Sequence, residues 1–171
     1  PSYVNELAHY IMQDLKEFRK IQGDDTLGGM VICETSEQAR RLYDVFQEEW
    51  QKYQPKPIKI KLPDGTFVVG EPEVDYKSKY RPLKAGIILH DTDDKETRKQ
   101  TVKDFKKNMT VDILIVFNML LTGFDAPRLK RLYFGRKLKD HNLLQAITRV
   151  NRPYPGMRYG FVIDFADIKR N

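Results

Sequence analysis

The sequence predicts an α/β domain with a mostly parallel sheet of about five strands and helices on both faces. Short apolar runs without a polar break, such as residues 113–117, alternate with stretches in which apolar residues recur at helical spacing. Strands buried on both faces read as continuous apolar runs, and strands connected by helices pair in parallel. At 171 residues, the chain is long enough to build one such domain around a buried core.

The first third of the chain predicts two helices separated by a strand. Over residues 3–22 apolar residues recur at helical spacing, and Gly23 provides a stop. Residues 30–33 form a short apolar run that predicts a buried strand. Thr35 and Gln38 have the spacing of a capping box, so a second helix is expected to begin there.

Residues 52–84 predict an insertion into the domain. This stretch contains five of the nine prolines and many lysines. Within it, Ile58, Ile60 and Leu62 alternate with lysines before a Pro-Asp-Gly turn at 63–65, a pattern typical of a β-hairpin. We assign no chemistry to this insertion.

The second half alternates strands and helices more regularly. Asp93 and Asp94 are expected to cap a polar helix that ends near Lys107, and another helix is expected from about His141. Apolar runs predict strands at 85–89, 111–117, 131–135 and 159–165. This order of elements favours parallel neighbours.

Composition favours a cytoplasmic globular protein with no membrane partner. Apolar residues make up 40% of the chain and charged residues 32%, proportions typical of a soluble domain. No apolar run is long enough to span a bilayer, and no signal-peptide pattern opens the chain. Cys33, the single cysteine, lies in an apolar run and is expected to be a buried small hydrophobe. The start at Pro1 suggests a piece of a longer protein.

Positive charge is concentrated towards the carboxyl end. Residues 128–158 contain nine basic residues and one acid, Asp140, so this segment carries +8 while the whole chain carries +6. The remainder therefore sums to −2. Such a concentration of charge is typical of a surface that meets nucleotide or nucleic-acid phosphates.

A helix within this basic segment presents two arginines on one face. Wound at about 100° per residue, residues 143–152 place Gln145, Arg149 and Arg152 within roughly 60° of one another, opposite an apolar back. Two guanidiniums side by side suit phosphate oxygens, because each offers a fixed fork of N–H donors. For this segment alone, a solvated basic face on an ordinary surface helix is the competing interpretation.

The loop after the 113–117 strand contains a second set of candidate residues. Ligands of parallel sheets gather beyond the carboxyl ends of the strands, and this loop is expected to lie there. Gly123 allows a ligand to approach the backbone, Asp125 offers a carboxylate to sugar hydroxyls, and Thr122 offers a hydroxyl to a phosphate. The alternative is an ordinary turn between strand and helix, in which Asp125 acts as a local cap before Pro127.

Together the two stretches resemble a known pair of motifs. The loop reads LLTGFDAPRL at 120–129, and the helix reads LLQAITRVNRPY at 143–154. They resemble motifs V and VI of the second RecA-like motor domain of superfamily 2 helicases, and their wording is most similar to the R (motor and endonuclease) subunit of type I restriction enzymes. The resemblance implies a three-layer RecA-like domain at 28–171, interrupted at about 52–84 and preceded by a linking helix at 1–27.

The resemblance also implies roles for single residues. Gly123 and Asp125 match motif V positions that touch nucleotide, and Gln145 matches the motif VI glutamine. Arg149 and Arg152 match the motif VI arginines that reach the γ-phosphate of ATP, with Arg152 as the arginine finger.

Two positions depart from the common helicase pattern. Thr122 stands where many helicases have arginine, and the resemblance implies a contact with DNA there. Thr148 stands where many helicases have glycine, which favours the restriction-enzyme branch.

The implied function is half of an ATP-dependent DNA translocase in a type I site-specific deoxyribonuclease. The sequence contains no G-x-x-x-x-G-K-[ST] phosphate loop, no convincing magnesium-binding acid pair, no metal-ligand set and no nuclease constellation. ATP and Mg²⁺ would therefore be held mainly by the first RecA-like domain of the same parent chain, and this piece alone is expected to be inactive. The implied partners are double-stranded DNA, that first domain, and the modification and specificity subunits.

Two other functions remain open from the sequence. The chain could be the second domain of another superfamily 2 DNA or RNA helicase. It could also be a non-catalytic α/β module whose basic face docks nucleic acid. Changes at Arg149 and Arg152 would then weaken DNA binding and leave ATP turnover alone.

Overall fold

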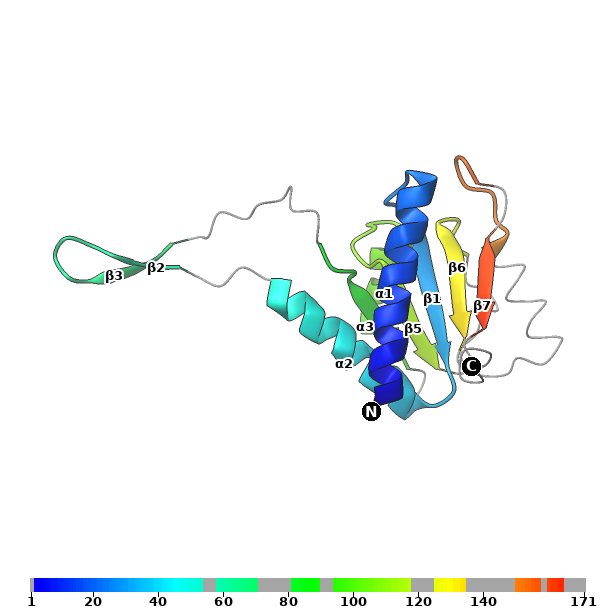
Figure 1. Ribbon diagram of the computed structural model, residues 1–171, viewed down its shortest axis with the longest axis horizontal. Coiled ribbons are helices and arrows are strands. Elements are labelled where there is room, and N and C mark those ends of the chain that lie inside the picture. Colours follow the sequence, from blue (N-terminus) through cyan, green and yellow to red (C-terminus); the bar gives the residue numbers. More distant parts are fainter. Residues whose placement is uncertain are drawn as a thin grey trace.

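Five strands form one parallel sheet, in the order β4–β5–β1–β6–β7 (Figure 1). The computed structural model describes residues 2–53, 58–70, 81–89, 94–117, 125–134, 150–157 and 160–164. The strands are β1 Gly28–Cys33, β4 Ala85–Ile88, β5 Ile113–Phe117, β6 Leu129–Phe134 and β7 Phe161–Asp164. Every pairing between neighbours is parallel. The predicted α/β class and parallel five-stranded sheet are confirmed.

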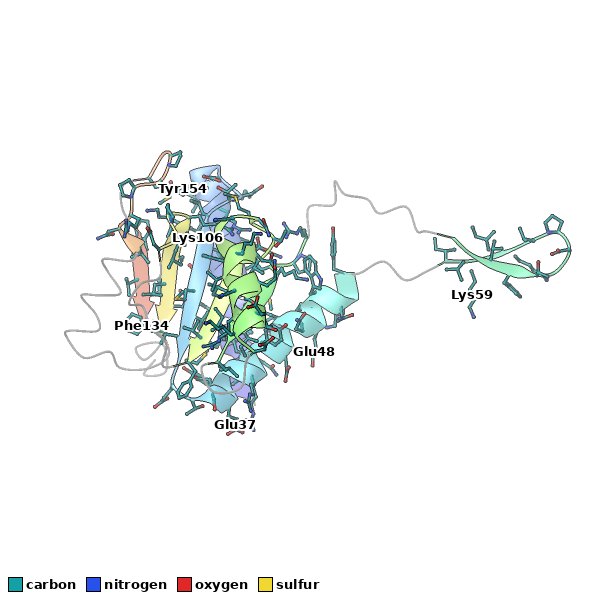
Figure 2. The ribbon with its side chains drawn as sticks, turned by 180° about the vertical axis from the view of Figure 1, so that it is seen from behind. Glu37, Glu48, Lys59, Lys106, Phe134 and Tyr154 are labelled. Atoms are coloured by element: carbon teal, nitrogen blue, oxygen red, sulfur yellow. The ribbon has the colours of Figure 1, made fainter. Side chains whose placement is uncertain are left out.

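Helices cover both faces of this sheet. α1 (Ser2–Gln22) and α2 (Ser36–Tyr53) lie on one face, and α3 (Lys95–Lys106) lies on the other, where Figure 2 shows it in front of the strands. The three layers are those implied by the sequence. No helix within the described ranges is long and apolar enough to cross a membrane.

The strands are apolar throughout because both of their faces are buried. On β5, Ile113 and Ile115 join the core formed with α1 and α2, while Leu114 and Val116 pack with Phe105 of α3. Complete burial of one such side chain contributes about 1.5–3 kcal/mol. Cys33 belongs to the first core, where burial raises the pKa of its thiol to about 12, as expected of a small buried hydrophobe.

α1 is part of the packing of the domain. Leu7, Ile11 and Leu15 are at most 4% exposed and belong to the same core as β1 and β5. The predicted division between a linking helix at 1–27 and a domain from residue 28 stays a prediction.

The two predicted helix starts differ in their capping. At α2, Gln38 N donates to Thr35 Oγ1 over 3.0 Å, and Glu34 N donates to Gln38 Oε1 over 2.8 Å, so the capping box is present with its return bond shifted by one residue. At α3, Asp94 occupies the N-cap position but makes no side-chain capping bond, which corrects the expectation. This helix start is exposed, so water can satisfy its N–H groups. Asp93 lies outside the described residues.

The insertion contains the predicted hairpin. β2 (Ile58–Lys61) pairs antiparallel with β3 (Phe67–Gly70), and Figure 1 shows the two strands projecting away from the sheet. Gly65 in the turn has φ +89°, a conformation that favours glycine. Large apolar side chains on both strands are exposed, for example Ile58 of β2 at 51% and Val69 of β3 at 73%.

Asp14 of α1 ties that helix to β6. Its carboxylate accepts hydrogen bonds from Arg131 Nε at 2.9 Å, from Arg131 Nη2 at 2.8 Å and from the Tyr133 hydroxyl at 2.5 Å. The Arg131 guanidinium also lies over the ring of Phe18, 4.5 Å from its centroid. These contacts fix α1 on β6, the strand at the start of the basic segment.

We expect Asp14→Asn to lower the free energy of unfolding by about 1.5–3 kcal/mol at neutral pH, the usual worth of hydrogen bonds to a charged group. Burial raises the pKa of the Asp14 carboxyl, but the hydrogen bonds from Arg131 and Tyr133 and the charge of Arg131 outweigh burial, so the folded pKa lies below its ordinary value. A carboxyl whose pKa is lowered by folding stabilises the folded state at pH values above its unfolded pKa. This contribution is lost as the pH falls through the folded pKa.

Urea unfolding of both proteins across pH tests this expectation. The difference between wild type and Asp14→Asn should be constant near neutral pH and shrink below about pH 4, the unfolded pKa of aspartate. A difference that stays the same from neutral to acid pH would contradict the role of the Asp14 charge.

Candidate functional site

Two of the predicted site residues meet in the structure. Asp125 lies four residues before β6, and Arg152 follows the helical residue Val150. Arg152 Nε lies 3.4 Å from Asp125 Oδ1. The two side chains are 45% and 44% exposed, so the pair is accessible from solvent. Residues from the two predicted motifs are thus brought together.

The other predicted site residues lie outside the described residues. These are Thr122, Gly123, Gln145 and Arg149. Their grouping around Asp125 and Arg152 stays a prediction. Val150 is fully buried in the core on the α3 side, as expected for the apolar back of the predicted helix. It is also the last helical residue: Asn151 lies in a turn and Arg152 in a bend, so the prediction that the helix extends to Arg152 is wrong.

The pair lies at the edge of the sheet where β6 begins, whereas the loop was expected at the carboxyl ends of the strands. Lys130, the second residue of β6, donates a hydrogen bond to the backbone carbonyl of Arg152, which places Arg152 near the amino-terminal end of that strand. Figure 2 shows Tyr154, two residues further on, at the far end of the sheet from Phe134, where β6 ends. A crossover between parallel strands must return to the start of the next strand, so the last residues of the loop reach this edge.

One oxygen of the Asp125 carboxylate has no hydrogen-bond partner among the described residues. This atom, Oδ1, is buried, and Arg152 Nε lies 3.4 Å away, beyond the usual N–H···O hydrogen-bond distance. An ion pair between half-exposed side chains contributes about 0–1 kcal/mol. The Arg152 guanidinium can therefore exchange this carboxylate for another anion at little cost.

The backbone around Arg152 is held by its neighbours. A Cβ at Gly160 would overlap the carbonyl oxygen of Val150, so only glycine fits there, and Gly160 N donates to Asn151 Oδ1 over 3.1 Å. Tyr154 and Met157 exchange backbone hydrogen bonds of 3.0 and 2.8 Å. The site therefore combines a fixed backbone with an exposed guanidinium.

Sequence reasoning missed two contributors to this arrangement, Lys130 and Gly160. Lys130 carried a detectable signal, since it is an ionisable residue beside an apolar strand run. Gly160 gave none, because the need for glycine there arises only from the approach of Val150.

Some of the basic residues at 128–158 are buried inside the domain. Arg128 is 2% exposed and donates to three backbone carbonyls, and burial together with the charge of Arg19 lowers its pKa to about 10. Lys130 is fully buried, and Arg131 pairs with Asp14. The charge of +8 at 128–158 therefore overstates the positive surface available to an anionic partner.

Two open hollows lie along α2, where Asp44 and Glu48 line both, and neither contains Asp125 or Arg152. Among the residues that the structure describes, no group of three or more His, Cys, Asp or Glu side chains could hold a metal ion. An exposed arginine and carboxylate at the rim of a domain suit a ligand presented by another surface.

Comparison with solved structures identifies the fold. Domain 2 of the DEAD-box helicase Mss116p, in a structure bound to an RNA duplex, matches with a TM-score of 0.58 over 94% of this chain and 48% of that one. The sequence identity is 15%, so this likeness shows the fold alone. The three-layer domain has the fold of a helicase carboxy-terminal domain.

Comparison of sequences identifies the family. A putative type I restriction enzyme endonuclease subunit of Methanocaldococcus jannaschii, MjaVIIIP, is 32% identical over 168 residues, which cover 95% of this chain and 15% of that protein. A second putative subunit of that organism, MjaVIIP, is 53% identical over 62 residues, 36% of this chain and 6% of that protein. Residues 74–167 match the family model for type I restriction enzyme subunit R domain 3. That match covers more than half of this chain. This chain therefore belongs to the family of type I restriction enzyme R subunits.

Proposed function

We propose that this chain is the second motor domain of an ATP-dependent DNA translocase in a type I restriction enzyme, and that Arg152 is its arginine finger. Family membership and the fold of a helicase domain 2 support this proposal. The chain spans about 15% of the length of the MjaVIIIP subunit, so the proposed activity belongs to a longer parent chain.

The pairing of Arg152 with Asp125 is the observation that carries the proposal. It joins the two stretches that resemble motifs V and VI at one edge of the sheet. The guanidinium is half exposed, and its present partner is a weakly held carboxylate. An arginine on a fixed backbone, with its donors accessible, suits a phosphate that arrives on another domain.

The chemistry is phosphoryl transfer, in which positioning and charge stabilisation carry most of the catalysis. ATP with Mg²⁺, held mainly by the first motor domain, would supply the phosphoryl group. Arg152 would offer its N–H donors to the charge that develops on that group, with Arg149 beside it. Asp125 would accept a hydrogen bond from a ribose hydroxyl, and Gly123 and Gln145 would line the nucleotide.

Coupling to movement would follow from the division of this site between two domains. The arginines complete it only when the domains close, so turnover and closure occur together. Repeated closure and opening would move the enzyme along double-stranded DNA, with Thr122 as a candidate DNA contact. Modification and specificity subunits would complete the assembly, and this domain alone would not turn over ATP.

The role of Asp125 provides a direct test with the parent subunit in its complex. We expect Asp125→Asn to raise the KM for ATP by up to about 10-fold, because a neutral amide oxygen replaces the charged acceptor of a hydrogen bond worth about 1.5 kcal/mol. The DNA-stimulated ATPase should be measured with ATP, 2′-deoxy-ATP and 3′-deoxy-ATP. For the wild-type enzyme, removal of the recognised hydroxyl should raise KM by a similar factor.

In Asp125→Asn, removal of that hydroxyl should have a smaller effect than in the wild type, because a neutral amide oxygen accepts a weaker hydrogen bond than a carboxylate. The matched control is Asp64→Asn, which changes an exposed aspartate in the hairpin turn and should leave KM unchanged. An unchanged KM in Asp125→Asn, or full discrimination between the three nucleotides, would remove Asp125 from the nucleotide site.

A further inference from the structure

β6 contains one residue more than its partner strand at its amino-terminal end. Gly28 of β1 pairs with Leu129, but Gly29 pairs with Arg131, so Lys130 is left without a partner on β1. Such a bulge interrupts the alternation of side chains and redirects one of them. Lys130 is the residue that this bulge redirects.

The redirected side chain ends at the backbone of the arginine segment. Lys130 is fully buried, and its Nζ donates to the carbonyl of Val150 over 3.2 Å and to the carbonyl of Arg152. Carbonyls at the end of a helix lack partners within that helix, and a cation there is favourable. Two donors of one ammonium thus hold the backbone on both sides of Asn151.

The ammonium of Lys130 has no acidic partner among the described residues, whose ion pairs do not include it. Burial accordingly lowers its pKa. A buried cation without a carboxylate is unfavourable unless its hydrogen bonds are made. Here the bonds go to the carbonyls of Val150 and Arg152. The same short segment is held a second time by the hydrogen bond from Gly160 N to the side chain of Asn151.

We infer that Lys130 is a positioning residue that fixes the backbone of Arg152, so that its exposed guanidinium is held at Asp125 and at the nucleotide interface. This inference rests on the proposed role of Arg152. Lys130 itself touches no reacting atom. Its contribution is to the geometry of the finger, and a displacement of about 1 Å at a reacting centre can cost about 100-fold in rate.

The experiment is a double-mutant cycle in the parent subunit within its complex, with Lys130→Met, Arg152→Ala and the double variant. Methionine is an unbranched side chain only one heavy atom shorter than lysine, and it donates no hydrogen bond. We expect Lys130→Met to lower the kcat of the DNA-stimulated ATPase by about 100-fold while the KM for ATP changes little. In the Arg152→Ala background, Lys130→Met should lower kcat no further, because the residue through which it acts is gone.

The matched control is Lys106→Met, which removes an exposed lysine from the last turn of α3 and should leave kcat unchanged. DNA binding and the unfolding temperature of each variant report on the fold. If Lys130→Met does not fold, Lys130→Gln takes its place, since a neutral amide retains a donor for one of the two carbonyls.

Each outcome decides the role of Lys130. An equal loss of kcat in both backgrounds, or wild-type turnover in a folded variant, overturns the positioning role. Failure of both variants to fold also overturns it, because the ammonium would then serve the fold itself. Near-normal turnover of Arg152→Ala alone refutes the proposed function instead, and that result does not depend on Lys130.

Discussion

Arg152→Ala in the parent R subunit should reduce DNA-stimulated ATP turnover by about 1,000-fold or more and leave DNA affinity nearly unchanged. Arginine fingers contribute factors of about 10³–10⁵ to phosphoryl transfer, because they stabilise charge that appears only in the transition state. The Arg152 side chain is half exposed and its pairing with Asp125 is weak, so its removal should not disturb the fold.

The measurement combines steady-state ATPase rates with DNA binding at several salt concentrations. Arg41→Ala is the matched control, because Arg41 is also exposed and forms a surface ion pair, with Glu37. This control should retain wild-type turnover. Arg152→Lys should restore only part of the lost rate, since an ammonium keeps the charge but lacks the fork of guanidinium donors.

The opposite result would change the function assigned to the domain. Near-normal turnover with weakened DNA binding would place Arg152 at a phosphate of the DNA backbone. The slope of log K against log[salt] would then fall by about one unit, as expected when one phosphate contact is lost. The chain would in that case act through this residue as a nucleic-acid-binding module.

Asp112→Asn should destabilise the domain by about 3–5 kcal/mol, the usual cost of removing one partner of a buried ion pair. Asp112 is 2% exposed, and its two oxygens accept hydrogen bonds from Arg19 Nη2 at 3.0 Å and from the backbone N–H of Lys84 at 2.8 Å. Arg19 is itself 7% exposed. Loss of the carboxylate charge would leave that guanidinium buried without its counter-ion.

Urea unfolding followed by circular dichroism provides the measurement. Glu49→Gln is the control, because it makes the same change of acid to amide in a solvent-accessible pair with Lys52 and should cost less than about 1 kcal/mol. An equal loss of stability in both variants would show that the buried pair between α1 and the start of β5 contributes no more than a surface one.

The sequence predicted the strands well because their signal is local. A strand such as β5 is buried on both faces, so every residue from Ile113 to Phe117 is apolar and the run stands out by itself. Asp125 and Arg152 were singled out as candidates because motif spacing and residue chemistry are also local, and their roles stay predictions. In both cases the information lies within about ten consecutive residues.

Features that depend on distant segments could not be predicted in this way. Lys130 and Arg128 read as part of a basic surface, but both are buried because the segments around residues 26, 105 and 150 approach β6. The ion pair of Arg19 with Asp112 joins residues 93 positions apart. Asp94 has the right residue type for a helix cap, yet its side chain makes no capping bond.

The position of β1 at the centre of the sheet constrains how the chain can fold. β1 is the first strand along the chain, but its two neighbours are β5 and β6, which begin at Ile113 and Leu129. Contacts so distant in sequence slow folding, because a long loop must close before they form. During synthesis, α1, β1 and α2 would emerge with their apolar surfaces uncovered until β5 leaves the ribosome. Such exposed surfaces promote aggregation, so protection of the nascent chain during this interval would favour correct folding.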